Sequence, residues 1–295
     1  MKKLMFTLFK QANAFLSRKG LRRVPGVPWA YSFLLERLRP RGIALTKLQG
    51  IKMYINADYE RVGLGGLLSQ SYEKAETELF NDMVTKGMTV VDIGANVGYY
   101  SLIAARLVGN NSKVYAFEPE PGNYKLLVRN IELNGYTNVI AVNKAVSNEC
   151  GIAELFLDRV SSSTHSLSQD NTFEKAVSIE VETVTLDEFF KDEKVDIIKL
   201  DAQGAEGLIL DGAENILKQD ELKIMMEFWP EGLSHLGTEP SALLHKLQEM
   251  GFKIKVINET TRYLLPAQVL ELIDLRKKEA GRTGLLSFIN LLLEK

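Results

Sequence analysis

The segment 89–101, Thr-Val-Val-Asp-Ile-Gly-Ala-Asn-Val-Gly-Tyr-Tyr-Ser, constrains the fold of this chain more than any other. Its first five residues form a short apolar, β-branched run, which is typical of a parallel strand buried on both faces. Two glycines then bracket a turn, and residues 99–108 carry apolar side chains at helical spacing. A second expected strand, 113–117, ends at Glu118, 20 residues after the second glycine. A carboxylate at this spacing meets ribose hydroxyls, so the pattern predicts a nucleotide-type cofactor site.

The turn itself, Gly94-Ala95-Asn96-Val97-Gly98, discriminates between cofactors. A dinucleotide site usually reads G-x-G-x-x-G, and Asn96 stands where the middle glycine would give a pyrophosphate room to approach. S-adenosylmethionine has no pyrophosphate, so the turn favours this cofactor over NAD. A tight strand-to-helix turn without any ligand is the alternative interpretation.

The amino-acid composition indicates the class of protein and the cellular compartment in which it is expected. The 295 residues are 45% hydrophobic and 25% charged, as in an ordinary globular protein. The single cysteine, Cys150, excludes an internal disulfide and favours a reducing, cytoplasmic localisation. No Cys and His cluster suggests a metal, and no apolar run approaches the length of a transmembrane helix.

The start of the chain is strongly basic. Residues 1–50 hold eleven Lys and Arg against one acid, Glu36, and residues 1–20 have apolar side chains at helical spacing. One interpretation is a helix in peripheral contact with the anionic inner membrane surface. The favoured one is a helix that covers the catalytic domain or a second subunit of a homo-oligomer, because amphipathic helices more often face protein than lipid. Nucleic-acid binding is disfavoured, because the basic segment is short and the rest of the chain is acidic.

The remaining pattern predicts an α/β domain with a doubly wound, mostly parallel sheet. Expected strands are 89–93, 113–117, 138–143, 195–200 and 222–228, followed by an antiparallel pair, 252–258 and 261–265; expected helices are 99–108, 121–134 and 204–218. The expected organisation is a basic helical extension at 1–45, a lead-in hairpin and helix at 46–88, the cofactor domain at 89–275, and a C-terminal segment at 276–295. An insertion at 149–188 contains two β-like runs around a polar loop, 159–173, which is a candidate substrate loop.

Acids at strand ends form a second group of candidate residues. Asp201 follows the expected strand 195–200, and Glu227 lies at the end of 222–228. Ligands of a doubly wound sheet bind where the strand order reverses, so Asp201 is expected to face the reactive end of the cofactor. Asp201 and Glu227, with His165 from the insertion loop, are the candidate catalytic residues. A helix-capping role is the alternative for Asp201, and plain solvation is the alternative for His165.

Four motifs together resemble the FkbM type of S-adenosylmethionine-dependent methyltransferase. They are Asp92-Ile-Gly-Ala-Asn-Val-Gly-Tyr-Tyr-Ser101, Phe117-Glu-Pro119, Lys199-Leu-Asp-Ala-Gln-Gly-Ala-Glu206 and Met226-Glu-Phe-Trp-Pro230. The resemblance runs from about residue 72 to 257, and the chain departs from the usual pattern at Ala202, where the family has Val. It implies a Rossmann-like class I methyltransferase fold, with a seven-stranded sheet and a reversed last strand, and usually O-methylation of a hydroxyl.

The resemblance also implies which residues hold S-adenosylmethionine. The glycine turn would support its methionine part, Glu118 its ribose, and residues 143–146 would lie near its adenine. The implied cofactor-binding residues are Asp92, Gly94, Ala95, Asn96, Gly98, Glu118, Pro119, Asn143, Ala145 and Asp201. The expected acceptor is a glycan, a glycolipid or a small metabolite. Two alternatives remain: an NAD-dependent oxidoreductase, and a non-catalytic, membrane-associated binding protein that keeps the methyltransferase fold.

Overall fold

The computed structural model describes residues 41–58, 73–158, 161–172, 177–257, 262–263, 265–280 and 288–295. The chain divides into two compact units, Met1–Glu73 and Lys74–Lys295. Residues 1–20, with their predicted amphipathic helix, lie outside the described part. Among the described residues, no helix combines the length and the apolar character needed to cross a membrane.

The described part of the first unit is a hairpin. Strand β1 (Ile43–Leu48) pairs antiparallel with β2 (Ile51–Asn56). Both residues between the strands are left-handed, Gln49 with φ 48° and Gly50 with φ 84°. Such a two-residue turn matches the right-handed twist of the strands it joins. The hairpin expected near residues 46–56 is therefore confirmed.

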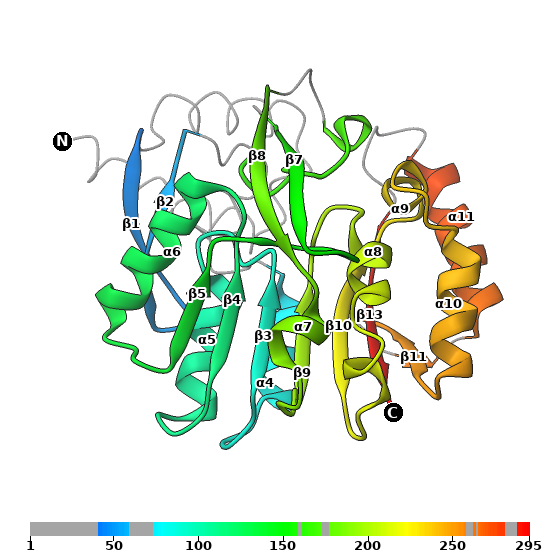
Figure 1. Ribbon diagram of the computed structural model, residues 1–295, viewed down its shortest axis with the longest axis horizontal. Coiled ribbons are helices and arrows are strands. Elements are labelled where there is room, and N and C mark those ends of the chain that lie inside the picture. Colours follow the sequence, from blue (N-terminus) through cyan, green and yellow to red (C-terminus); the bar gives the residue numbers. More distant parts are fainter. Residues whose placement is uncertain are drawn as a thin grey trace, which may run out of the picture. The chain divides into compact units, whose positions relative to one another are not determined.

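An eight-stranded sheet is the centre of the second unit, in the order β12-β11-β13-β10-β9-β3-β4-β5 (Figure 1). Neighbouring strands from β10 to β5 run parallel. Strand β3 lies between β4 and β9, so the strand order reverses beside β3. The strands are β3 (Val90–Ile93), β4 (Val114–Phe117), β5 (Val139–Val142), β9 (Ile197–Leu200), β10 (Lys223–Phe228), β11 (Lys253–Val256), β12 (Arg262–Tyr263) and β13 (Ile289–Glu294).

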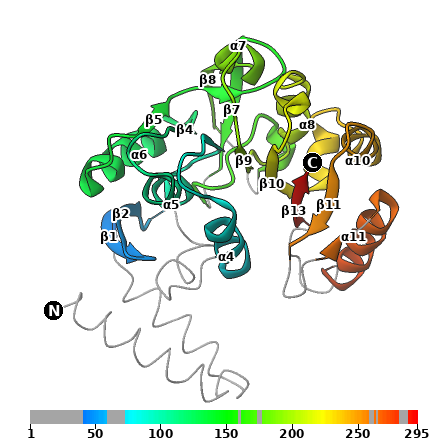
Figure 2. The same cartoon turned by 90° about the horizontal axis from the view of Figure 1, so that it is seen from below.

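Helices cover both faces of this sheet, with α4 and α5 on one side and α7 and α8 on the other (Figure 2). The helices are α4 (Lys74–Met83), α5 (Tyr99–Val108), α6 (Pro121–Asn134), α7 (Leu186–Phe190), α8 (Glu206–Asp211), α9 (Pro230–His235), α10 (Pro240–Glu249) and α11 (Pro266–Ala280). Strands β3, β4 and β9 are buried at every position, as their unbroken apolar runs predict. The Rossmann-like, mostly parallel sheet with a reversed last strand is confirmed.

The reversed strand is β13, which comes from a segment to which the sequence analysis assigned no strand. It runs antiparallel to both β10 and β11 and separates them. Leu291 and Leu293 on β13 are fully buried. The expected antiparallel pair is also present as β11 and β12, and the two-residue β12 is the eighth strand of the sheet.

The helix expected at 204–218 is shorter in the structure. Helix α8 ends at Asp211, and a separate 3-10 turn, η3 (Ile216–Lys218), follows. A Cβ atom at Gly212 would overlap the carbonyl oxygen of Ser147, so the chain is closely packed where the helix stops. The Asp187 carboxylate then accepts hydrogen bonds from the amides of Asn215 and Ile216 and holds the next turn.

The insertion at 149–188 contains two strands, as its pattern predicts. β7 (Gly151–Leu157) and β8 (Val177–Val184) pair antiparallel, and β6 (Ala145–Val146) completes a three-stranded sheet in the order β6-β8-β7. This small sheet rises above the carboxyl ends of the central strands (Figure 1). The loop between β7 and β8 contains a 3-10 turn, η2 (Gln169–Asn171). The insertion therefore stands at the edge where a doubly wound sheet binds its ligands.

Candidate active site

The first glycine turn is in contact with the acid-bearing turn after β9. Gly94 has φ 78°, and a Cβ atom there would overlap the carbonyl oxygen of Asp201. The amide of Asp201 donates to the carbonyl of Ile93 at 3.1 Å. Only glycine allows this approach, because the position needs both a left-handed backbone and empty space. The two motifs, more than 100 residues apart in sequence, therefore form one edge of the site.

The second glycine closes the turn against α6. Gly98 has φ 96°, and a Cβ atom there would lie 2.7 Å from Leu127 Cδ1. The side-chain amide of Asn130 donates to the carbonyl of Val97 at 2.8 Å. Helix α6 thus fixes the shape of the turn that the sequence assigns to the cofactor.

Glu118 is held by two backbone amides. The amide of Asn96, which has φ 50°, donates to Oε2 at 2.7 Å, and the amide of Glu120 donates to Oε1 at 2.9 Å. Burial raises the pKa of Glu118 to about 8, although both amides favour the charged form. A carboxylate has about four acceptor positions, and the Asn123 side chain is a third neighbouring donor, so room remains for one further donor.

Asn143 and Pro119 belong to the same corner. The side-chain amide of Asn143 donates to the carbonyls of Glu118 and Pro119, at 2.8 and 3.0 Å. Ala145 is different, because its side chain packs with Leu155 and Val181 in the core of the small sheet. The structure therefore brings Asn143 next to Glu118 and places the Ala145 side chain in the core of the small sheet.

Asp92 lies inside the sheet, opposite Lys199 on the neighbouring strand β9. It is 2% exposed and accepts a hydrogen bond from Ser101 Oγ at 2.5 Å. Burial raises the pKa of Asp92 to about 6. Asp92 thus ties β3 to the first turn of α5 behind the glycine turn.

The acids at the ends of β9 and β10 are joined by a glutamine. Gln203 Nε2 donates to Asp201 Oδ1 at 2.8 Å and to Glu227 Oε1 at 3.2 Å. Lys199 Nζ lies 3.4 Å from Asp201 Oδ2. The Asp201 side chain is still 30% exposed, so its carboxylate is reachable from solvent. Asp201 and Glu227 are therefore bridged by Gln203, which the sequence analysis did not select.

Glu206 is a capping residue of the same turn. It is 1% exposed, and its Oε1 accepts from the amides of Ala202 and Gly204 at 2.9 and 3.3 Å. Burial raises the pKa of Glu206 to about 7. Its Oε2 has no hydrogen-bond partner in the described part of the chain. Glu206 thus shapes the turn that presents Asp201.

The geometry of His165 does not suit a base. Its Nδ1 lies 3.0 Å from the amide of Asp158, and this amide can only donate. Nδ1 therefore accepts, and in the neutral ring the proton sits on Nε2. Burial lowers the pKa of His165, which favours the neutral form. The ring can donate a hydrogen bond from Nε2 but has no lone pair left to remove a proton.

Asn171 was not selected from the sequence, yet it joins three parts of the site. Its side-chain amide nitrogen lies 3.2 Å from Ser166 Oγ, 3.0 Å from the Gln203 carbonyl and 3.2 Å from the Gly232 carbonyl. Its Oδ1 lies 2.7 Å from Nδ1 of His235. An asparagine in a polar loop has no distinctive sequence signal, because its partners are distant in the chain.

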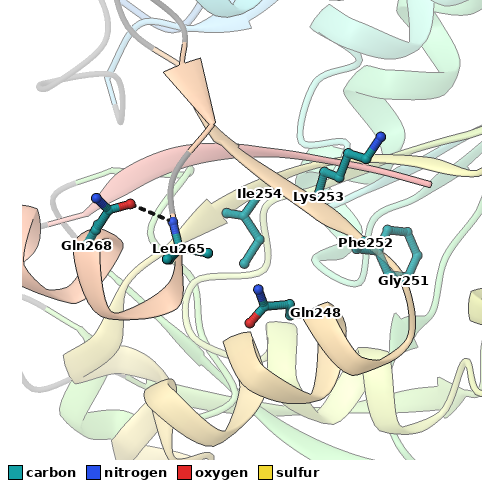
Figure 3. Close-up of a pocket in the computed structure, with 7 residues that line it drawn as sticks. All are labelled: Gln248, Gly251, Phe252, Lys253, Ile254, Leu265 and Gln268. Atoms are coloured by element: carbon teal, nitrogen blue, oxygen red, sulfur yellow. Dashed lines mark hydrogen bonds between the residues drawn. The ribbon is translucent and has the colours of Figure 1, made fainter.

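A cavity of about 430 Å³ lies elsewhere, between the end of α10, the start of β11 and the start of α11 (Figure 3). Strand β11 runs parallel to β10, so its start is at the edge of the sheet opposite to Asp201. The cavity is lined by Gln248, Gly251, Phe252, Lys253, Ile254, Leu265 and Gln268. None of these is a predicted site residue. In the described part of the chain, no group of three or more His, Cys, Asp or Glu residues could hold a metal ion.

The curated proteins most similar to this chain include methyltransferases. Methyltransferase sdnD of Sordaria araneosa is 29% identical over 176 residues, which cover 49% of this chain and 68% of that protein. A protein-L-isoaspartate O-methyltransferase of Methanococcoides burtonii is 39% identical over 71 residues, which cover 24% of this chain and 34% of that protein. This chain thus spans about a third of the length of the second relative.

Among solved structures, methyltransferase FkbM of Methylobacillus flagellatus superimposes with a TM-score of 0.43 at 14% identity, covering 79% of this chain and 52% of that chain. A family model, the methyltransferase FkbM domain, matches residues 92–254. The match begins at the aspartate before the glycine turn, includes both acid-bearing strand ends, and covers more than half of the chain. The chain belongs to the FkbM methyltransferase family.

Proposed function

We propose that this protein transfers a methyl group from S-adenosylmethionine to a hydroxyl on a glycan, a glycolipid or a small metabolite. One observation carries the proposal: the glycine turn after β3 touches the Asp201 turn after β9. A cofactor on the first turn is then adjacent to a partly exposed carboxylate on the second. Bringing two reactants together in this way contributes much of the acceleration in transfer reactions.

Family membership makes S-adenosylmethionine the cofactor, rather than NAD. The residues present fit this molecule. The Glu118 carboxyl keeps room to accept from a ribose hydroxyl, and buried Asn96 Oδ1 has no partner among the described residues. An ammonium group such as that of the methionine part is a donor of the kind this oxygen lacks. When bound, S-adenosylmethionine supplies an electrophilic methyl group on its sulfonium.

The charges of the site favour a hydroxyl over a carboxylate as acceptor. Asp201 and Glu227 are joined by Gln203 at the carboxyl ends of β9 and β10. A carboxylate acceptor would be repelled by these two acids, whereas a hydroxyl can donate a hydrogen bond to either of them. Sugar and lipid headgroups offer several such hydroxyls, and this supports the choice of acceptor class.

The test is transfer of label from methyl-labelled S-adenosylmethionine into fractionated cell extract. We expect label in a polar, hydroxyl-rich fraction that keeps it through mild alkali, because an ether survives conditions that hydrolyse a methyl ester. Volatile labelled methanol after alkali would show carboxyl methylation instead. The Asp211→Asn variant should transfer label as the wild type does, because this exposed acid on α8 pairs only with Lys246 in the described structure.

A further inference from the structure

The hydrogen bonds around His235 determine which of its ring nitrogens carries the proton. We propose that His235 is the base of the methyl transfer, taking the acceptor's proton on Nε2, with its tautomer set by Asn171. This inference rests on the proposed function and adds a catalytic residue to it.

The neighbours of Asn171 determine the orientation of its side-chain amide. The side chain is 5% exposed, and one of its two terminal atoms faces the main-chain carbonyls of Gln203 and Gly232, at 3.0 and 3.2 Å. Carbonyl oxygens only accept, so the terminal atom that faces them must be the amide nitrogen. The other terminal atom, which faces His235, is therefore the amide oxygen.

The tautomer of His235 follows from this orientation. Its Nδ1 is 2.7 Å from Asn171 Oδ1, an atom that only accepts, so Nδ1 must carry the proton. A neutral imidazole has one proton, which leaves a lone pair on Nε2. No hydrogen bond to Nε2 occurs within the described structure, and the residue is exposed. His165 has the opposite arrangement, because its Nδ1 accepts from a backbone amide.

His235 is also at the edge of the sheet where the acceptor is expected. Helix α9 starts directly after the carboxyl end of β10, and His235 is its last residue. Asn171 connects His235 to the Gln203 carbonyl, while the Gln203 side chain binds Asp201 and Glu227. A Cβ atom at position 204 would overlap the Asn171 amide, so Gly204 leaves the room that this connection needs.

The methyl transfer forms one bond, breaks one bond and moves one proton. The acceptor oxygen forms a bond to the methyl carbon while the bond from that carbon to sulfur breaks, and sulfur keeps the electron pair. The hydroxyl proton passes to Nε2 of His235, and the imidazolium that forms donates from Nδ1 to Asn171 Oδ1. Asp201 accepts a hydrogen bond from a second, neighbouring hydroxyl of the acceptor and so orients the molecule. A positioned base typically accelerates such a step about 10²- to 10⁴-fold.

The tautomer can be measured without any substrate. The chain has three histidines, so single His→Gln variants assign all imidazole signals of protein labelled with ¹⁵N at the histidine rings. At about pH 8.5, where an unperturbed imidazole is neutral, we expect Nδ1–H for His235 and Nε2–H for His165. An Nε2–H tautomer at His235 would overturn the proposal.

Activity is the second measurement. The His235→Gln variant has no basic nitrogen, so label transfer to the fraction modified by the wild type should fall by about 100-fold or more. Its affinity for S-adenosylmethionine by calorimetry should not change. His245→Gln is the control, because His245 is exposed on α10 and, among the described residues, bonds only Ser241 of its own helix.

The remaining outcomes are also decisive. If His235→Gln keeps the wild-type rate, or loses rate and cofactor affinity together, the pair with Asn171 only fastens the insertion to α9 and the proposal is wrong. A wild-type protein that transfers no label to any fraction overturns the proposed function and the catalytic role with it. The ¹⁵N spectrum would then still decide the tautomer.

Discussion

Glu118 is positioned before any ligand arrives, because two backbone amides hold its carboxylate. Its two bonds come from the glycine turn and from the start of α6, so the same contacts that fix the local fold also aim the side chain. Sequence spacing selected Glu118, and the structure places its carboxyl against the amide of Asn96 in the glycine turn. No spacing rule could identify Asn171, since its partners come from three distant segments.

Replacing Glu118 by Ala should weaken binding of S-adenosylmethionine. Leaving a buried ribose hydroxyl without its partner costs about 1–3 kcal/mol, so a loss of roughly 10- to 100-fold in affinity is expected. Calorimetry measures the affinity, and circular dichroism checks that the fold survives. Glu149→Ala, an exposed residue, is the control. An unchanged affinity would contradict the ribose assignment.

Asp201→Asn should lower turnover more than cofactor affinity. Asn keeps an oxygen that can accept from Gln203 Nε2, but it loses the charge that would strengthen a hydrogen bond from a second hydroxyl of the acceptor. We expect turnover to fall by about 10- to 100-fold, equivalent to roughly 1.4–2.8 kcal/mol of transition-state stabilisation. Single-turnover label transfer measures it, with Asp211→Asn alongside. Wild-type turnover would mean that Asp201 only binds its neighbours Gln203 and Lys199.

The turns after β3 and β9, which form the site, contain residues with left-handed backbone conformations. Gln203 has φ 51° and Gly204 φ 98°, and the buried carboxylate of Glu206 closes this turn from below by capping two amides. A buried carboxyl with a raised pKa binds a proton more readily in the folded chain than in the unfolded chain. The free energy of unfolding therefore falls as pH rises from 4.5 toward the folded pKa of about 7.

Glu206→Gln should flatten this dependence. The variant keeps an oxygen for the amides of Ala202 and Gly204 and cannot ionise, so it loses less stability between pH 5 and about 7 than the wild type does. Urea unfolding of the ligand-free protein at several pH values measures the slope. Glu118 and Asp92 contribute slopes of the same sign in both proteins. Identical curves for variant and wild type would refute the burial argument.

Elements with strong local signals were predicted well from the sequence, and those set by long-range packing were not. Helix α6 has the predicted bounds, because Glu120 caps its start and Gly135 ends it with φ 69°. The end of α8 depends on Gly212 packing against Ser147, a contact that local sequence does not reveal. Strand β13 also lacks a local signal, because only its neighbours β10 and β11 make it a strand.

At the scale of the whole molecule, the central sheet depends on β13 for continuity. Its buried leucines contact the core that also contains Phe228 and Ile254 from its two neighbouring strands. Without β13, the facing edges of β10 and β11 would both lack a paired strand. The strand that local sequence predicts least well, β13, therefore lies inside the sheet and not at its edge.

Leu291→Ala on β13 should destabilise the second unit strongly. The side chain is fully buried, and truncating a buried Leu to Ala costs about 2–5 kcal/mol. Thermal or urea unfolding measures the loss. Ile152→Ala on β7 is the control, since Ile152 is 70% exposed and should change stability by less than about 0.5 kcal/mol. A small effect at Leu291 would mean that β13 adds little to the sheet.

The basic segment before the described residues calls for a separate experiment. We propose that residues 1–20 cover protein rather than bind lipid, so the full chain should not float with vesicles that contain anionic lipid. Flotation with and without residues 1–40 tests this, and light scattering of both forms reports the oligomeric state. Flotation that disappears on deletion would favour a peripheral membrane protein instead.

The place of β13 also has a consequence for synthesis. Of the eight strands, it is the last to leave the ribosome, yet it belongs between two that have already emerged. Until it arrives, β10 and β11 present unpaired edges with an apolar gap between them, which is the kind of surface that invites wrong pairing. The nascent chain therefore passes through an interval in which the glycine turn after β3 and the Asp201 turn after β9 have been made, but the sheet that supports them is still open. In this interval we expect the protein to depend most on chaperones.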